Sequence, residues 1–478
     1  MDDLQKPGLL SGGQVTRREV LKKGLVGAAG LTVLPAVIAA CSSSATPTVA
    51  PATQAPATQA PGTQVPATPV PTPNGQLTGV LKIGSNHSDP SEVNGMTAIN
   101  AAFTAATGLT PTMNTVDHNT FQDQINSYLN GTPDDALTWF SGFRMRFFAA
   151  KGLATQIDDV WATVSSNFTT GFATSVTGDD SHIYGIPVDY YPWCVFYRPS
   201  VFTAKGYTVP ATWSDLVTLA AKMKSDGLTP IAFSDKDGWP AMGTFDILDL
   251  RLNGYDFHIG LMTGANKWTD PKVTAVFKQW AQLVPFYTNG YAGLTWQQAC
   301  DTLISKKAGL FFLGLFLTGE FATVEKSTTV TDLDFFPFPT LGTAYDAEAA
   351  LDAPIDIWML SAKSPTLQAD LTNAKAYLAF WSKGSTQYLM YKNNNGFIPT
   401  ANDADTTKFD PLTQKAVKIV SAAKKITQFM DRDTRPDFAG ANGMQSFLLD
   451  FLKNPTQDTT ALQASIQKFW DALPAFTG

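Results

Sequence analysis

The sequence predicts an α/β fold with two lobes, and three observations support this prediction. Short apolar runs alternate with helical patterns from residue 77, and a second alternation of this kind begins near residue 195. A strand–helix–strand order predicts parallel strands joined by crossover helices. The length of 478 residues leaves room for roughly two to three domains of about 150 residues.

The first helix of the first run has clear end signals. Asp89 is a favourable N-cap, Pro90 follows at the first helical position, and Gly108 ends the apolar periodicity. Asn119 is expected to cap the second helix, which ends before Gly131. The expected elements of this run are strands at 80–85, 109–116 and 136–140 and helices at 90–107 and 120–130.

Polar and aromatic residues follow the carboxyl ends of these three strands. Ligands of parallel sheets bind beyond those strand ends, so the residues predict a site for a polar ligand with apolar faces. Each histidine could equally be a capping or turn residue, and a tryptophan at a strand end is often part of the core. The residues at this edge are Ser85, His87, Asp117, His118, Trp139 and Ser141.

The second run is longer and ends in a helical region. Its apolar segment at 309–317 is too short for a membrane span and suits a buried strand. Residues 234–240 are rich in Asp and contain Gly and Pro, so we expect a loop there. The expected strands are 195–197, 230–233, 309–317 and 355–360, and the expected helices start at 212–214 and 271 and then cover 365–383, 385–393, 411–423, 444–452 and 459–470.

Residues 1–40 have the layout of an export signal. Arg17 and Arg18 precede an uncharged apolar stretch at 24–40, and the last residues up to Cys41 resemble a lipobox, in which the cysteine is lipidated. The alternative is a transmembrane anchor, but a span needs about 20 apolar residues and this stretch is shorter. The pattern leaves open whether the twin-arginine or the general export route is used.

The segment after Cys41 has the composition of a tether. Residues 42–73 contain only Ser, Ala, Thr, Pro, Val, Gln and Gly, and such a segment cannot bury a core. Frequent proline favours an extended chain. We therefore expect 41–76 to be a lipid-anchor cysteine and a tether, which hold an exported lipoprotein at the outer face of the cytoplasmic membrane.

Charge and motifs exclude several classes of protein. The chain has 34 Lys and Arg against 41 Asp and Glu, so we expect no nucleic-acid partner. The four histidines lack metal-ligand spacing, and phosphate-loop and nucleophile-elbow motifs are absent from the sequence. We therefore expect no metal, no cofactor and no identifiable catalytic residue. Cys194 and Cys300 could pair, but two separate buried thiols are expected.

Several segments, taken in order, resemble one protein family. Residues 182–188 and 195–202 resemble a "YGIP … YN-x-x-LF" segment, with Arg198 in place of the usual Asn. Further matches are 205–216 to "G-x-x-x-P-x-T-W-x-E-L", 228–239 to "G-x-T-P-I-A … G-W", and 395–399 to "NG-x-x-P". From about residue 77 to its end, the chain resembles the carbohydrate-binding, maltose-binding-protein-like branch of the extracellular solute-binding proteins of ABC importers.

This resemblance implies a two-lobe, periplasmic-binding-protein-like fold with a hinge and a ligand cleft between the lobes. By the family pattern, lobe 1 comprises 77–187 and 359–401, and lobe 2 comprises 188–358 and 402–478. The resemblance further implies a monomer that captures a sugar, performs no catalysis, and delivers the sugar to the transmembrane subunits of a permease.

The candidate ligand-binding residues come from the strand ends and from the resemblance. Sugars stack their C–H faces on aromatic rings and need fixed donors and acceptors for their hydroxyls. Phe316 resembles the family's stacking "G-x-W" position but could be a core residue, and each polar candidate could be structural. The candidates are Trp239, Trp139, Phe316, His87, His118, Asp246, Asp356, Trp358 and Arg432.

Two other functions stay open at this point. The protein could bind a solute that is not a sugar, because one fold serves many ligands. It could also be a tethered glycosidase, because the carboxylate pair of such enzymes has no short sequence signature. A binding protein returns its sugar unchanged, and an enzyme does not.

Overall fold

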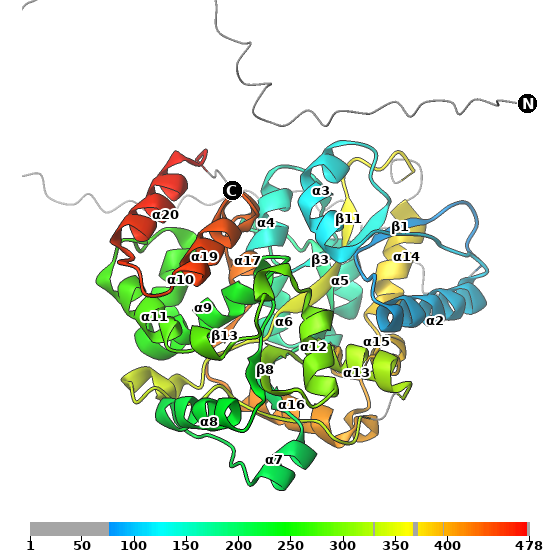
Figure 1. Ribbon diagram of the computed structural model, residues 1–478. Coiled ribbons are helices and arrows are strands. Elements are labelled where there is room, and N and C mark those ends of the chain that lie inside the picture. Colours follow the sequence, from blue (N-terminus) through cyan, green and yellow to red (C-terminus); the bar gives the residue numbers. More distant parts are fainter. Residues whose placement is uncertain (1–75, 328–329, 367–370, 395, 476–478) are drawn as a thin grey trace, which may run out of the picture. The chain divides into compact units, whose positions relative to one another are not determined.

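Two larger sheets organise the computed structural model of the protein (Figure 1). The strand expected at 355–360 in the second run belongs to the first sheet, where it lies between strands of the first run and β5 (Gly185–Tyr190). The structure describes residues 76–478 except 328–329, 367–370, 395 and 476–478. The predicted export signal, Cys41 and the predicted tether up to residue 75 lie outside the described residues, as does Asn395 of the last motif.

The first sheet is mixed and has the strand order β12-β5-β11-β3-β1-β2, with β4 paired to β11. The strands β1, β2 and β3 run parallel, as predicted, whereas β11 runs antiparallel to both β3 and β5. Its strands are β1 (Lys82–Ser85), β2 (Thr112–Thr115), β3 (Ala136–Phe140), β4 (Ala154–Thr155), β5 (Gly185–Tyr190), β11 (Ile355–Ser361) and β12 (Ile398–Pro399).

The second sheet has the order β7-β8-β6-β9. The strands β7 and β8 are parallel, and β6 is antiparallel to β8 and β9. They are β6 (Trp193–Tyr197), β7 (Thr229–Ala232), β8 (Ala308–Gly314) and β9 (Asp334–Phe336), and a separate pair consists of β10 (Leu351–Asp352) and β13 (Ile426–Thr427).

The chain passes from one sheet to the other more than once. Strand β5 ends in the first sheet at Tyr190, and β6 begins in the second sheet at Trp193. Strand β11 returns to the first sheet at Ile355. We call the part around the first sheet lobe 1 and the part around the second sheet lobe 2. The boundaries at 187/188, 358/359 and 401/402 stay a prediction.

Helices cover both sheets and extend beyond them. In Figure 1, α2, α14 and α15 gather beside lobe 1, and α9, α11, α19 and α20 form a second group. Their bounds are α2 (Pro90–Thr107), α3 (His118–Asn130), α4 (Phe143–Ala150), α5 (Asp158–Val164), α6 (Thr170–Ser175), α7 (Pro199–Lys205), α8 (Trp213–Ser225), α9 (Trp239–Asn253), α10 (Tyr255–Thr263), α11 (Pro271–Ala281), α12 (Trp296–Ile304), α13 (Thr318–Glu325), α14 (Leu371–Trp381), α15 (Gly384–Tyr391), α16 (Pro411–Ala422), α17 (Met430–Asp433), α18 (Pro436–Ala439), α19 (Met444–Lys453) and α20 (Thr460–Ala472).

The end signals of α2 are confirmed. Asp89 and Glu92 form a reciprocal capping box, Pro90 is the first residue, and Gly108 closes the helix with a φ of 78°. The cap predicted for α3 is wrong by two residues, because the side chain of Asp117 accepts the hydrogen bond from the Thr120 amide.

Three other predictions need correction. Helix α9 begins at Trp239, inside the expected loop at 234–240, and it has no apolar periodicity because nearly every one of its residues is buried. The expected strand at 309–317 ends at Gly314 and continues as a 3-10 turn. The expected helix at 365–383 does not include Pro365 and Thr366, which form a turn, and its described part is α14 at Leu371–Trp381.

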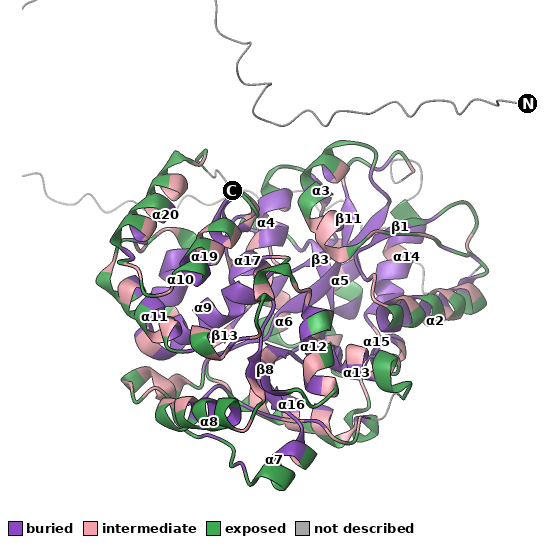
Figure 2. Cartoon of the chain, in the orientation of Figure 1, coloured by how far each residue is buried: buried purple, intermediate pink, exposed green. Residues whose placement is uncertain are grey.

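The core is rich in large aromatic residues. Figure 2 shows the buried residues in the middle of the molecule and exposed residues on outer helices such as α2, α7 and α20. Cys194 and Cys300 are both buried free thiols, as expected. Within the part of the chain that the structure describes, no helix combines the length and apolar character that a membrane crossing requires.

Candidate functional site

A cavity of about 320 Å³ lies between residues of both lobes. Lobe 1 contributes the turn after β1 and the start of α3, and lobe 2 contributes the starts of α9 and α12 and the turn after β8. Helix α17 and the residue before it form a further side of the cavity through Phe429, Asp431 and Arg432. The lining residues are Asn86, His87, Ser88, Asp89, Glu92, Asp117, His118, Asn119, Gln122, Tyr191, Trp193, Lys236, Asp237, Trp239, Thr295, Trp296, Gln297, Phe316, Pro354, Asp356, Phe397, Phe429, Asp431 and Arg432.

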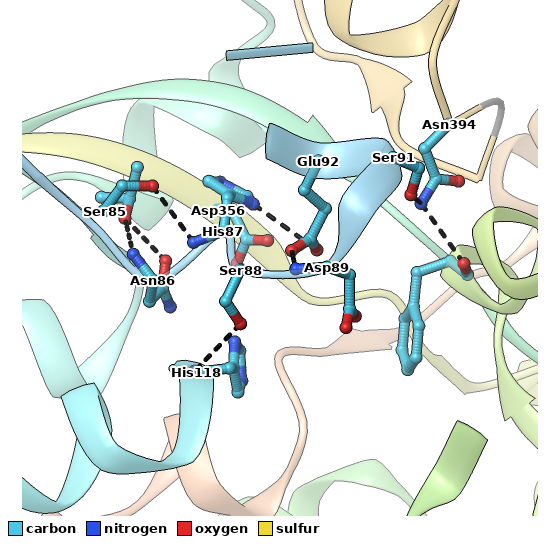
Figure 3. A network of polar contacts seen from close by, with 12 residues as sticks. Ser85, Asn86, His87, Ser88, Asp89, Ser91, Glu92, His118, Asp356 and Asn394 are labelled. Carbon is cyan, nitrogen blue, oxygen red and sulfur yellow. Dashed lines mark hydrogen bonds and ion pairs between the residues drawn. The ribbon is translucent and has the colours of Figure 1, made fainter. Parts of the chain in front are cut away.

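Backbone and side-chain hydrogen bonds fix the turn after β1 (Figure 3). The amide of Asn86 donates to Thr138 Oγ1 at 2.9 Å, and the amide of His87 donates to Ser85 Oγ at 3.1 Å. The amide of His118 donates to Ser88 Oγ at 3.2 Å and so connects the start of α3 to this turn. The histidines at the two predicted strand ends therefore line one wall.

His87 and Glu92 form a buried ion pair in that wall. His87 Nδ1 lies 3.6 Å from Glu92 Oε1, and Figure 3 shows the two side chains pointing toward each other. Burial disfavours the imidazolium, but the hydrogen bond and charge of Glu92 outweigh it and raise the pKa of His87 to about 9. Burial lowers the pKa of His118, so His118 is neutral at pH 7.

Arg432 connects α17 to lobe 1. Its Nη1 donates to Asp356 Oδ1 at 2.8 Å, its Nη2 donates to Tyr191 Oη at 2.6 Å, and the guanidinium lies 3.9 Å from the centroid of the Phe140 ring. All of its partners are buried. Because the arginine is held on three sides, Asp356 and Tyr191 are presented to the cavity in fixed positions.

Aromatic rings form the wall of the cavity that belongs to lobe 2. The Trp239 ring lies 6.0 Å from Trp193 and 6.1 Å from Phe316, each in an edge-to-face arrangement. Phe316 also contacts Trp296 and Tyr191, each at 5.1 Å. Trp239 and Phe316 are half-buried, so parts of their rings are free to contact a ligand.

One hydrogen bond crosses the cavity from lobe to lobe. Gln297 Nε2, on α12, donates to Asp89 Oδ1 at 3.1 Å. Burial, together with the charge of Glu92, raises the pKa of Asp89 to about 7. This side chain therefore changes charge near neutral pH at a contact between the lobes.

Six of the nine candidate residues line the cavity, namely His87, His118, Trp239, Phe316, Asp356 and Arg432. Three do not. Trp139 is buried against Phe140 and Phe148, and Trp358 is buried against Tyr377 and Trp381. Asp246 is buried in α9, where its Oδ2 accepts a hydrogen bond from the Met430 amide at 2.6 Å. Asp246 thus stabilises the start of α17 without lining the cavity.

Several lining residues were missed. The sequence marks Asp89 only as a helix cap, and Glu92, three residues later, is not among the candidates. Trp193 follows the "YGIP" motif, and Asp431 is adjacent to Arg432, so both were near recognised positions. Tyr191, Trp296, Gln297 and Phe429 come from separate parts of the chain and had no local signal.

The site offers binding groups of two kinds: carboxylate, amide, imidazole and guanidinium groups on lobe 1 and α17, and aromatic faces on lobe 2. Such a combination binds a polar ligand that also has apolar faces. Among the described residues, no group of three or more His, Cys, Asp or Glu side chains could hold a metal ion.

Curated relatives of the chain include transporter-associated binding proteins. An uncharacterised ABC transporter extracellular-binding protein of Pyrococcus horikoshii is 24% identical over 299 residues, which are 62% of this chain and 65% of that protein. The chain thus spans just under two thirds of that relative's length. The alpha-glucosides-binding periplasmic protein AglE of Rhizobium meliloti is 24% identical over 403 residues, which are 79% of this chain and 84% of that protein.

A solved structure is more similar still. The bacterial solute receptor AcbH is 40% identical, with a TM-score of 0.77 over 83% of this chain and 99% of the receptor, and it has an exclusive substrate preference for β-D-galactopyranose. This similarity confirms the predicted two-lobe α/β fold. The family model of bacterial extracellular solute-binding proteins matches residues 89–387, which is more than half of the sequence. The chain belongs to the family of bacterial extracellular solute-binding proteins.

Proposed function

We propose that the protein is the substrate-binding component of an ABC importer, which captures a sugar between its two lobes and delivers it to the permease. The observation that carries this proposal is the composition of the cavity walls. Trp239 and Phe316 offer aromatic faces on one side, and Asp356, Glu92 and Arg432 offer fixed polar groups on the other.

A sugar ring matches these two walls. Its C–H faces pack on aromatic rings, and each hydroxyl donates and accepts hydrogen bonds. A hydrogen bond to a charged group contributes about 1.5–3 kcal/mol, so a few of these contacts support specific binding. The preference of the 40% identical AcbH for β-D-galactopyranose makes a hexopyranose the first choice of ligand.

The same geometry supports closure of the lobes on a ligand. The chain crosses at 190–193 and returns at 355, close to the predicted boundaries at 187/188 and 358/359, and we propose that these crossings belong to a hinge. A ligand that contacts both walls favours the closed state over the open one. We propose that the protein acts as a monomer and without catalytic activity.

The N-terminal region supports a location outside the cytoplasm. The export signal at 1–40 and the lipobox-like residues before Cys41 suggest a lipoprotein at the outer face of the cytoplasmic membrane. The tether that follows would hold the lobes above the membrane surface, within reach of the permease.

Calorimetric titration with D-galactose, D-glucose and α-glucosides, followed by chromatography of the bound sugar, tests the proposal. Saturable binding with intact sugar recovered supports it. Recovery of a cleaved sugar would favour a glycosidase instead. If no sugar in the panel binds, the proposal is wrong, and the cleft serves a solute of another class.

A further inference from the structure

Two buried polar atoms of the cavity wall have no hydrogen-bond partner within the described part of the protein. They are the indole Nε1 of Trp193 and the carboxylate Oδ1 of Asp431. Trp193 is 3% exposed and Asp431 is 5% exposed. An unpaired buried polar group costs roughly 1–3 kcal/mol, and native proteins contain few of them.

Lack of a partner alone does not distinguish Trp193, but its position does. Trp139, Trp268, Trp358 and Trp381 are also buried, and their indole nitrogens also have no partner among the described residues. None of those four lines the cavity, and Trp193 does. Of these five tryptophans, Trp193 alone borders the space in which a ligand would bind.

Packing fixes the direction of the Trp193 N–H. The ring stacks on Phe429 at 4.8 Å and contacts Phe312 at 5.5 Å. Gly243 leaves the space for it, because a Cβ atom on Gly243 would lie 2.5 Å from the Trp193 ring. A donor whose ring cannot turn loses little conformational entropy when it binds, so it favours one ligand orientation.

Asp431 is held in a comparable way. The backbone amide of the preceding residue, Met430, donates a hydrogen bond to Asp246. The side chain of the following residue, Arg432, donates hydrogen bonds to Asp356 and Tyr191. Its nearest cations are Arg144 Nη2, 3.6 Å from Oδ2, and Arg432 Nε, 3.8 Å from Oδ1. Both distances exceed a normal hydrogen bond, so Oδ1 keeps its capacity to accept one.

We propose that Trp193 and Asp431 are specificity-determining ligand-binding residues. The Trp193 N–H donates to one oxygen of the sugar, and Asp431 Oδ1 accepts from one of its hydroxyl groups. This inference rests on the proposed function, since hydroxyl groups supply both the acceptor and the donor. It predicts that the ligand must carry at least one free hydroxyl group facing α17.

The test combines variants of the protein with variants of the ligand. Titrations use D-galactose and its monodeoxy analogues with the wild type, Trp193→Phe and Asp431→Asn. Trp139→Phe is the matched control, because it removes a buried indole N–H that does not line the cavity. Melting temperatures confirm that each variant is folded before titration.

Trp193→Phe should weaken D-galactose binding about threefold to tenfold, the cost of one neutral hydrogen bond, and Asp431→Asn should weaken it about tenfold or more. The control should bind like the wild type. For each variant, one monodeoxy analogue should show no difference from the wild type, because that analogue already lacks the oxygen concerned. A purely structural effect of the substitution would weaken all analogues equally.

Two results would overturn the inference while the proposed function stands. Either D-galactose binds both variants as tightly as the wild type, or the losses are the same for every analogue. If Trp193→Phe does not fold, the Asp431→Asn series alone decides. A loss of affinity that is absent for one monodeoxy analogue supports the inference, and no loss or equal losses overturn it. If the wild type binds D-glucose instead, the monodeoxy series of D-glucose replaces that of D-galactose. If the wild type binds no sugar at all, the proposed function fails, and this inference fails with it.

Discussion

Arg432 Nη1 lies 2.8 Å from Asp356 Oδ1, so a buried ion pair joins α17 to strand β11 at the edge of the cavity. The two residues are far apart in the sequence, and Tyr191 Oη accepts the second hydrogen bond of the same guanidinium. The contact makes the position of α17, and with it Asp431, depend on lobe 1.

Arg432→Met should destabilise the protein by about 3–5 kcal/mol, because it leaves the buried Asp356 carboxylate without its cation. Urea unfolding measures this change. The double variant Arg432→Met/Asp356→Leu should recover much of the lost stability but not the binding of D-galactose. If the single variant is as stable as the wild type, the pair does not hold α17 in place.

Trp239→Ala should lower sugar affinity at least about tenfold without unfolding the protein, because it removes an aromatic face that lines the cavity. Titration with D-galactose measures the affinity, and circular dichroism checks the fold. Trp161→Ala is the matched control, since Trp161 is also half-buried but stacks on Phe168 away from the cavity. Equal effects of the two substitutions would contradict a role for Trp239 in binding.

The sequence predicted those elements whose signals are local. Asp89, Pro90 and Gly108 set the ends of α2 by capping and backbone geometry, and both ends are confirmed. Helix α9 had no such signal, because it is buried on nearly all sides and therefore lacks the apolar stripe by which helices are recognised.

A strand end or a family motif marked four of the six candidate residues that line the cavity. His87 and His118 follow strands, and Trp239 and Phe316 occupy motif positions, so these could be named. Trp358 is two residues from Asp356 and would share its face in a regular strand, but the register of β11 shifts directly after Asp356, and Trp358 is buried in the core. Trp193, Asp431 and Gln297 meet only in the folded chain, which no local pattern encodes.

The His87–Glu92 pair predicts a pH dependence of stability. The folded-state pKa of His87, about 9, lies above the unfolded value near 6.5. The contribution of protonated His87 to the free energy of unfolding is therefore fully present below pH 6.5 and disappears as the pH rises through 9. The groups that face His87 are Glu92, Asp189 and Asp356. Between pH 6.5 and 9 the free energy of unfolding of the wild type should fall by on the order of 3 kcal/mol more than that of a variant without the pair.

His87→Gln/Glu92→Gln is the matched reference for this measurement. Glutamine at position 92 can keep the reciprocal cap with the Asp89 backbone, so α2 keeps its start. Urea unfolding of both proteins at several pH values gives the difference. Parallel pH profiles for the two proteins would show that the pair is not ionised as inferred.

Cys41→Ala tests the predicted lipid anchor. In a bacterial host, the wild type should incorporate a labelled fatty acid and remain with the membrane fraction, whereas the variant should do neither, because the acyl chain supplies the membrane affinity. Persistence of the variant in the membrane without label would instead support the alternative, in which the apolar stretch at 24–40 is a permanent anchor.

Asp246 should affect binding although it does not line the cavity. Its Oδ2 accepts the Met430 amide hydrogen bond at the start of α17, and His258 faces it from α10 at 3.8 Å. Asp246→Ala leaves that amide without an acceptor and should loosen α17, which lowers D-galactose affinity roughly threefold to tenfold through Asp431 and Arg432. Asp246→Asn keeps an acceptor of the same shape, so its affinity should stay within about twofold of the wild type. Titration and thermal melting of both variants separate this positioning role from a general loss of stability. If Asp246 were only a stabilising residue, both variants would melt at a lower temperature, and their affinities for D-galactose would not differ from each other.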